Sequence, residues 1–398
     1  MEPTPVTAAE FPAFITAFQA AFHRDTEPLD VVRLSRIVER ERTLALREGG
    51  RIVATTAIHS RRLTIPGGEV PMAGVTLVGV LPTHRRRGLM TALMRRQLTD
   101  VHEAGAESIA ALWASEAAIY GRFGYGMAAE SAELQVVRAH ARLRAVPTAP
   151  AELYRPIDAV AAMRAIHDAA RRSAPGMLDR AGPWWDARID DQEAERAGAG
   201  PLRAAVVDGA AYALYAIKED WDRRPASQVR VRELVAATPE GAAAIWGLLL
   251  GLDLTSRLVY GMAPRDDPLV HMLTDGRAVS TRVGDSLWVR LVDLPRALAE
   301  RAYLQPFEVV LEVADEPCPW NAGRWALRWD GSGASCERTT LPAGLALGAA
   351  ELGAAYLGGT TLDVLARAGR VRELRAGALA AASRGFTWDR APWCPEIF

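Results

Sequence analysis

The pattern of apolar and polar positions singles out one stretch in the first quarter of the chain. Residues 75–81 are mostly apolar and rich in β-branched side chains, which predicts a buried strand. Pro82 ends this strand, because proline has no N–H group to give to a neighbouring strand. From Leu89 to Leu98 apolar residues recur at helical spacing. The pattern therefore predicts a strand that passes into a helix through the turn 85–88.

The turn between this strand and this helix has the sequence Arg85-Arg86-Arg87-Gly88. The free N–H groups at the start of a helix, together with the positive end of its dipole, bind phosphate oxygens. Gly88 lets the backbone come close to an anion, because glycine has no Cβ. The turn has neither the Lys-Ser/Thr pair of a Walker A loop nor the spacing of a dinucleotide-binding turn. It predicts a site for a diphosphate-bearing cofactor, and the alternative is a solvated basic surface.

The same pattern predicts the elements on either side of the central strand. A capping box at Thr7 and Glu10 precedes an amphipathic helix over residues 11–22. Ser115-Glu116 is typical of the start of a second, short helix, which carries Tyr120 and stops at a glycine-rich turn. The remaining strands expected in this part are Thr43–Leu46, Ile52–Ile58, Arg62–Ile65 and Ser108–Ala114.

Two motifs in this part resemble those of the GNAT acyltransferases. The run 85–90 resembles the R-x-x-G-x-G/A signature that holds the pyrophosphate of coenzyme A, although Met90 stands where a small residue is usual. The run 119–126, Ile-Tyr-Gly-Arg-Phe-Gly-Tyr-Gly, resembles the Y-x-x-x-G-[FY] turn that follows the fifth GNAT strand. Together with residues 114–116 and 82–89, it closely resembles the Eis (enhanced intracellular survival) family of acetyltransferases.

The rest of the chain fits the three-part order of that family. After a proline-containing linker at 147–150, strand and helix patterns repeat the first plan without an arginine-glycine turn, which indicates a degenerate GNAT-like domain. The last part resembles a sterol-carrier-protein-like module, interpreted as a packing domain rather than a lipid-binding one. The predicted fold is α/β (α+β), with tandem GNAT domains at 1–146 and 147–292 and an α+β module at 293–398. The predicted elements there are strands at 202–207, 211–217, 229–237, 308–313 and 325–329 and helices at 160–170, 242–252, 344–350, 361–366 and 371–382.

The resemblance implies an N-acetyltransferase with acetyl-CoA as acyl donor. It implies that Val78 and Val80 offer backbone hydrogen bonds to the pantetheine arm and the acetyl carbonyl. It also implies that Tyr120 gives a proton to the departing thiolate, since a phenol with a pKa near ~10 is protonated at neutral pH. Tyr125 fits a packing role better. The residues implied to line the donor site are Val78, Gly79, Val80, Arg85, Arg86, Arg87, Gly88, Leu89, Met90, Thr91, Ser115 and Glu116.

The end of the chain carries the second implied catalytic group. Eis proteins use their C-terminal carboxylate as general base, and this chain ends at Phe398. An α-carboxyl with a pKa near ~3.5 is a weak base, so desolvation or a water relay is needed. The penultimate residue is Ile397, where the family pattern has an acid, and Glu396 stands one place earlier. A carboxylate that binds a substrate cation is therefore missing or displaced.

Composition and charge exclude several classes of function. The formal net charge of −1 argues against a dedicated nucleic-acid binder. Three cysteines and seven histidines are too scattered for a disulfide framework or a metal site. The first residues do not form a cationic signal peptide, and no apolar run is long enough to cross a membrane. We therefore expect a cytoplasmic protein with no metal and with neither nucleic acid nor membrane as a partner.

The acceptor and the assembly follow from the resemblance alone. It implies acetylation of aminoglycoside- or polyamine-like small amines by a homohexamer. Two alternatives stay open: transfer to a protein lysine or N-terminus, and a non-enzymatic sensor that binds acyl-CoA or a lipid on the same scaffold. The sequence does not identify the physiological amine or the positions that are acetylated.

Overall fold

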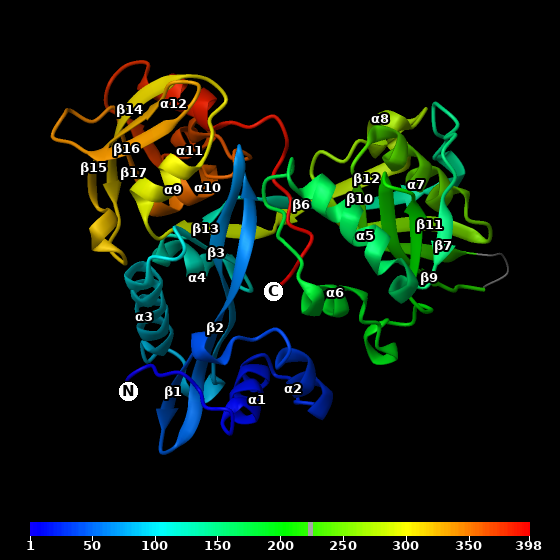
Figure 1. The fold of residues 1–398 in the computed structure, drawn as a ribbon, viewed down its shortest axis with the longest axis horizontal. Coiled ribbons are helices and arrows are strands. Elements are labelled where there is room, and N and C mark those ends of the chain that lie inside the picture. The colour runs from blue at the N-terminus through cyan, green and yellow to red at the C-terminus, as the bar shows by residue number, and fades with distance from the viewer. Residues whose placement is uncertain (222–225) are drawn as a thin grey trace. The chain divides into compact units, whose positions relative to one another are not determined.

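The computed structural model describes residues 1–221 and 226–398. Contacts divide the chain into two compact units, whose elements are labelled in Figure 1. Unit 1 contains Met1–Ala129, Ser286–Asp389 and Glu396–Phe398, and unit 2 contains Glu130–Asp285 and Arg390–Pro395. Within these described ranges, no helix is both long and apolar enough to cross a bilayer. The same ranges hold no group of three or more His, Cys, Asp or Glu side chains that could bind a metal ion.

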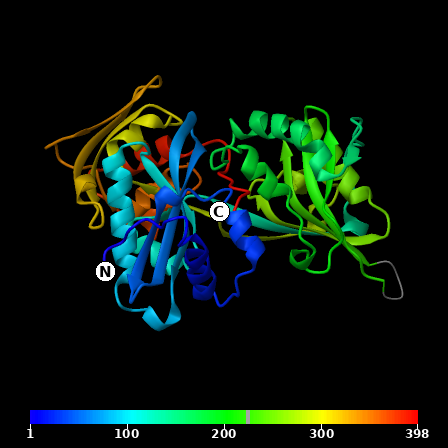
Figure 2. The ribbon, with the colours of Figure 1, turned by 60° about the horizontal axis from the view of Figure 1, so that its bottom comes forward.

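Unit 1 begins with an open sheet that has helices on both faces. The strand order is β1-β2-β3-β4-β13-β5. Apolar residues of α1 pack on one face, around Phe14, and those of α3 pack on the other, around Leu98 (Figures 1 and 2). The elements are α1 (Phe11–Ala21), α2 (Pro28–Leu34), β1 (Thr43–Glu48), β2 (Arg51–Ile65), β3 (Gly68–Val80), α3 (Leu89–Ala104), β4 (Ile109–Trp113), α4 (Ala117–Tyr120), β5 (Gly126–Met127) and β13 (Leu287–Leu291).

The second sheet of unit 1 has the order β16-β15-β14-β17-β18. Its elements are α9 (Leu294–Glu300), β14 (Phe307–Ala314), β15 (Gly323–Trp329), β16 (Ala334–Arg338), β17 (Leu345–Gly348), α10 (Ala349–Ala355), α11 (Leu362–Arg367), β18 (Val371–Glu373) and α12 (Ala378–Phe386). Aromatic rings surround the buried guanidinium of Arg301, which lies 4.5 Å from the ring centre of Tyr303 and 4.8 Å from that of Phe386. These rings form a cation–π cluster around Arg301 in the interior of this part of unit 1.

Glycines join the two sheets of unit 1. A Cβ at Gly126 would lie 1.9 Å from the carbonyl oxygen of Ala350, and one at Gly353 would lie 2.2 Å from that of Val289. No side chain fits at either position, because α10 packs directly on the backbones of β5 and β13. The last glycine of the 119–126 motif is therefore needed for packing.

Unit 2 is a single sheet with helices, in the strand order β12-β6-β11-β10-β9-β8-β7. Its core includes the fully buried rings of Tyr212, Trp246 and Tyr260. The elements are β6 (Glu130–Val137), β7 (Glu152–Tyr154), α5 (Pro156–Arg171), α6 (Gly182–Ile189), β8 (Arg203–Val207), β9 (Ala211–Lys218), β10 (Ser227–Ala236), α7 (Pro239–Gly251), β11 (Thr255–Pro264), α8 (Leu269–Met272) and β12 (Val279–Asp285).

The sheets and the predicted domain boundaries divide the chain differently. Strand β6 precedes residue 146 and belongs to the sheet of unit 2, and β13 precedes residue 292 and belongs to the first sheet of unit 1. The boundaries at 146 and 292 stay predictions. Hydrophobic periodicity shows where strands are, but the choice of neighbouring strand depends on contacts that are distant in sequence.

Most predicted elements are confirmed and two helices are wrong. The predicted strands 52–58 and 62–65 are both confirmed as parts of β2, which runs unbroken because its ladder with β3 continues to Ile65. The predicted helix 344–350 is strand β17 followed by the start of α10, since β17 pairs in parallel with β14. The predicted helix 371–382 is strand β18 followed by α12. The predicted strands at 202–207, 211–217, 229–237, 308–313 and 325–329 and helices at 160–170, 242–252 and 361–366 are confirmed.

Candidate active site

The two parallel strands at the centre of the first sheet separate part of the way along. Strand β3 pairs with β4 from Met72 to Gly74, opposite Ile109 to Ala111, and among the described residues the ladder ends there. Beyond Gly74, β3 continues to Val80 beside β2. The backbone edge of β3 that faced β4 is therefore available to a ligand in this opening, which we call the first split.

A β-bulge shapes the end of β3. Leu77 and Val78 together oppose the single residue Thr56 on β2. Leu77 has φ 51°, in the left-handed region that costs a non-glycine residue about 1–3 kcal/mol. The Thr55 hydroxyl donates a 2.8 Å hydrogen bond to the Leu77 carbonyl oxygen and holds the bulge. Bulges turn a strand, and this one lies where Val78, Gly79 and Val80 were predicted to meet the donor.

The turn after β3 leaves the start of α3 open. Gly88 is the residue before the helix, at φ 77°, and a Cβ there would meet nothing within 4 Å. No side chain in the described part of the chain caps this helix start. The first-turn residues Leu89, Met90 and Thr91 therefore point N–H groups at an open space, as an anion site requires. The buried Leu89 side chain packs with the core, so it can serve a donor only through its backbone.

The three arginines of this turn that were predicted to line the donor site have different surroundings. Arg85 donates a 3.0 Å hydrogen bond to the carbonyl oxygen of Ala21, at the end of α1. Arg87 lies 2.6 Å from a carboxylate oxygen of Glu48, whose other oxygen is 2.7 Å from His84. Arg86 is exposed. Sequence reasoning missed Glu48 because it lies at the far end of another strand.

Glu48, at the end of β1, stays negatively charged beside this turn. Its hydrogen bonds with Arg87 and then His84 lower the pKa of the Glu48 carboxyl to about 2. Arg87 is thus held beside a permanent carboxylate at neutral pH, and a phosphate must share or displace that partner. Arg86 is also exposed, and among the described residues no carboxylate pairs with its guanidinium.

Tyr120 ends the short helix α4 and its ring is buried, with 4% of its surface exposed. It meets the Tyr125 ring edge-on at 6.1 Å between ring centres. Burial raises the pKa of the Tyr120 phenol, which a hydrogen bond from Ser115 partly offsets. Glu116 is the N-cap residue of α4, as the sequence predicts, but its side chain makes no capping hydrogen bond. Ser115 contacts Tyr120 instead.

The tail of the chain covers the opposite face of β3. A Cβ at Gly74 would lie 3.2 Å from a ring carbon of Phe398, so this ring rests on Gly74. The neighbouring side chains of Ala73 and Val75 face the apolar cluster that contains Tyr120. Side chains alternate along a strand, so the Phe398 ring lies on one face of β3 and the cluster that contains Tyr120 lies on the other.

A buried ion pair lies next to this contact. Arg61 Nη2 is 3.1 Å from Glu396 Oε2, and the two side chains are 1% and 7% exposed. Ile397, between Glu396 and Phe398, is 67% exposed. Sequence reasoning singled out Glu396 as an acid one place from its expected position but did not identify Arg61.

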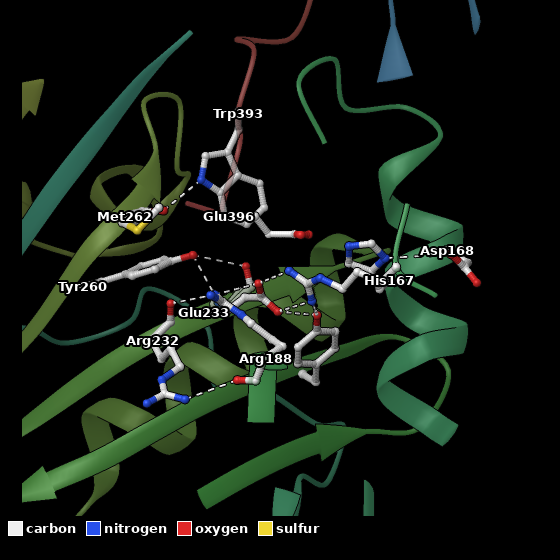
Figure 3. A network of polar contacts seen from close by, with 12 residues as sticks. His167, Asp168, Arg188, Arg232, Glu233, Tyr260, Met262, Trp393 and Glu396 are labelled. Carbon is white, nitrogen blue, oxygen red and sulfur yellow. Dashed lines mark hydrogen bonds and ion pairs between the residues drawn. The ribbon is translucent and has the colours of Figure 1, made fainter. Parts of the chain in front are cut away.

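In unit 2 the strand–helix–strand plan recurs, and its opening is filled. Strand β10 pairs in parallel with β11 as far as Val231 and Tyr260, and among the described residues that ladder ends there. Just beyond, the Leu234 N–H donates a 3.1 Å hydrogen bond to the Tyr260 hydroxyl. The indole N–H of Trp393 donates to the Met262 carbonyl oxygen at 2.8 Å (Figure 3). We call this place the second split.

A charged cluster lies beside the second split. Glu233 is fully buried, 2.5 Å from Arg180 and 2.8 Å from Arg188. Figure 3 shows Glu233 beside Arg188. Burial alone would raise the pKa of Glu233, but the two arginines outweigh it and lower that pKa. The helix start that follows is closed too, because Thr238 accepts a 3.0 Å hydrogen bond from the Gly241 N–H. The absence of an arginine-glycine turn from this part of the sequence fits this geometry.

Comparison with known proteins places these features in a family. Residues 2–128 and 176–291 each match an acetyltransferase (GNAT) domain, and residues 294–395 match a sterol carrier protein domain. An uncharacterized N-acetyltransferase of Streptomyces coelicolor is 42% identical over 100% of both chains. The N-acetyltransferase Eis of Mycobacterium tuberculosis is 36% identical over 92% of this chain and 89% of its own.

A solved structure agrees along the whole length. The crystal structure of Eis1 from Mycobacterium abscessus has a TM-score of 0.88, with 33% identity over 100% of both chains. The order of two GNAT domains and a sterol carrier protein domain matches the predicted fold class. This chain is an N-acetyltransferase of the Eis family.

Proposed function

We propose that this enzyme acetylates amines of aminoglycoside- or polyamine-like small molecules, with Tyr120 as general acid and the Phe398 carboxylate as general base. The observation that carries the proposal is the seat of the Phe398 ring on Gly74, where the β3–β4 ladder ends. It brings the end of the chain to the first split. Tyr120 belongs to the apolar cluster that lies on the other face of β3.

The acyl donor of GNAT domains is acetyl-CoA, and the first split fits it. The open helix start at Gly88 suits a diphosphate, and the bulge at Val78 presents backbone groups along the path of an extended chain. The thioester supplies the activated acetyl group. The residues proposed to line the donor site are Val78, Gly79, Val80, Arg85, Arg86, Arg87, Gly88, Leu89, Met90, Thr91, Ser115 and Glu116. Arg85 contributes by fixing the turn to α1, and Arg86 by direct charge.

Proton transfer assigns separate tasks to the two ends of the site. Tyr120 stays protonated at neutral pH, since burial raises the pKa of its phenol, so it can give a proton to the thiolate as it leaves. The α-carboxylate of Phe398 takes a proton from the attacking ammonium, directly or through one water. Phe398 as a whole is half-buried, and the proposed role requires a carboxylate that loses part of its water, which makes it a stronger base.

The acceptor class rests on the family relationship, and protein lysines or N-termini are the second candidate. A thioester-cleavage assay with a panel of aminoglycosides, polyamines and peptides separates the two. Turnover with peptides alone would reverse the assignment. The proposed assembly is a homohexamer. Because oligomers close symmetrically, we expect its subunits to form rings. Light scattering at micromolar concentration measures the mass of the assembly.

The terminal base is tested by adding one glycine after Phe398. The extension moves the carboxylate by roughly one residue, ~3.5 Å, beyond the ~3 Å range of proton transfer. We expect kcat to fall by about 100-fold or more, while acetyl-CoA still raises the thermal midpoint of the folded protein. An extended enzyme that acetylates amines at the native rate would show that the terminal carboxylate is not the base.

A further inference from the structure

The last three residues of a chain fray unless something holds them. A general base, however, has to stay within about 3 Å of the atom from which it takes the proton. In this chain Glu396 and Phe398 each have a fixed contact in unit 1. The Glu396 carboxylate pairs with Arg61 at 3.1 Å, and the Phe398 ring rests on Gly74.

The two contacts share one face of the sheet. Arg61 on β2 is the register partner of Met72 on β3, so both side chains point the same way. Gly74 is two residues further along β3 and faces the same side as Met72. The tail is therefore bound along one edge of the first split, at the charged group of Glu396 and then at the ring of Phe398.

We propose that Arg61 is a positioning residue, which fixes the direction of the terminal carboxylate through its buried ion pair with Glu396. This inference rests on the proposed role of the Phe398 carboxylate. A guanidinium is planar and holds a carboxylate in a defined orientation, which an apolar contact does not do. Because Ile397 is 67% exposed, packing by that side chain does not set the tail.

The pair also assigns a role to the displaced acid of the tail. A carboxylate that pairs with a buried guanidinium is largely neutralised and is not offered to a substrate ammonium. Glu396 thus acts on the chain's own end rather than on the amine. Substrate charge has to be met by other acids.

The experiment compares Glu396→Gln and Arg61→Gln with Arg62→Gln. Arg62 is the next residue on β2 and pairs with Glu69 at the surface, so it controls for loss of one arginine from the same strand. Glutamine keeps the size of Glu396 and removes its charge. We expect about a tenfold or greater fall in kcat for either variant of the buried pair. The KM for acetyl-CoA should change by less than about twofold, and Arg62→Gln should behave as wild type.

A second background separates positioning from stability. In the protein extended by one glycine after Phe398 the base is already displaced, so Glu396→Gln should produce no further fall in the residual kcat. An equal fall in both backgrounds would mean a purely structural role and overturn the proposal. Arg61→Lys, which keeps the charge, should recover part of the rate, and it replaces Arg61→Gln if that variant does not fold.

The outcomes also distinguish this inference from the proposed function. If the glycine extension abolishes turnover while both buried-pair variants keep the native kcat, the terminal base stands and the positioning role of Arg61 is wrong. If the extension leaves turnover intact, the terminal base is wrong and the inference fails with it. Acetyl-CoA protection against thermal unfolding, measured for every variant, confirms that the donor site is folded.

Discussion

In unit 1, β3 leaves β4 after Gly74 and leads to a helix start that none of the described side chains caps. In unit 2, β10 leaves β11 after Val231 and leads to a helix start that Thr238 caps. The backbone beyond the second ladder already has a hydroxyl partner in Tyr260. The same chain plan thus gives an open split in one sheet and a filled split in the other.

The difference shows that donor binding in a GNAT sheet needs backbone groups that the protein itself does not pair. The first split keeps backbone groups available and stores strain in the left-handed Leu77, whereas beside the second split Glu233 is paired with Arg180. Buried polar groups that are paired stabilise a fold, and those left for a ligand make a site. We therefore expect changes in the second split to affect stability and changes in the first to affect turnover.

The largest effect is expected for Glu233→Ala. It leaves the buried Arg180 and the partly buried Arg188 without the carboxylate between them, which should lower the free energy of unfolding by about 3–5 kcal/mol. Urea denaturation measures this, and the kcat of the folded fraction should match wild type. Glu312→Ala, at an exposed pair with Arg324, is the control and should change stability by less than about 0.5 kcal/mol. Normal stability with lost turnover would assign the second split to catalysis.

The pH dependence of stability should have opposite signs in the two units. Burial, and then the charge of Arg61, lowers the pKa of His59 in unit 1 to about 4. A histidine that is neutral when folded contributes stability above its unfolded pKa of ~6.5, and this is lost as pH falls toward 4. Burial raises the pKa of Asp267 in unit 2 to about 6. A carboxyl with a raised pKa instead gains stability as pH falls from about 6 to 4.

Each of these shifts corresponds to about 3 kcal/mol at most, at 1.36 kcal/mol per pH unit. Denaturation curves of His59→Asn and Asp267→Asn between pH 4 and 7 test them. Relative to wild type, His59→Asn should remove a loss of stability at low pH, and Asp267→Asn should remove a gain. The same direction of change in both variants would contradict the assignment.

The site features that could be predicted from the sequence lie within short segments, and those that could not be predicted join residues far apart in the sequence. The turn at Gly88 is recognisable because strand, turn and helix signals follow one another directly. Tyr120 stands out because its run resembles the Y-x-x-x-G-[FY] turn of the family. The Arg61–Glu396 pair joins residues 335 positions apart, and Glu48 reaches Arg87 from another strand. No spacing rule predicts such partners. The missing arginine-glycine turn of unit 2 indicated a lost phosphate site, but not that Tyr260 fills the split.

In the first split we expect Tyr120→Phe to lower kcat by about 100-fold, which corresponds to ~2.7 kcal/mol in the barrier. The substitution removes the proton donor and keeps the ring that packs on Tyr125. Thermal midpoint and acetyl-CoA protection should stay at wild-type values. Tyr125→Phe is the matched control on the other ring of the pair and should leave kcat unchanged. Equal turnover by wild type and Tyr120→Phe would require another proton donor.

The smallest effects come from the two helix starts, and they test the comparison most directly. Gly88→Ala places a Cβ at φ 77°, where an L-residue loses about 1–2 kcal/mol, although nothing lies within 4 Å of it. The methyl group then occupies the space in which we propose that the diphosphate lies, so the KM for acetyl-CoA should rise. Thr238→Ala removes the cap of α7 and should lower stability by about 1 kcal/mol.

Both variants thus lose similar stability, and they differ in how they respond to the donor. The rise in thermal midpoint produced by a fixed concentration of acetyl-CoA depends on its affinity for the folded state. That rise should shrink for Gly88→Ala and stay at the wild-type size for Thr238→Ala. If Thr238→Ala also reduces it, the helix start of unit 2 takes part in donor binding and the second split is not closed. If neither variant reduces it, the donor is held elsewhere than at the start of α3.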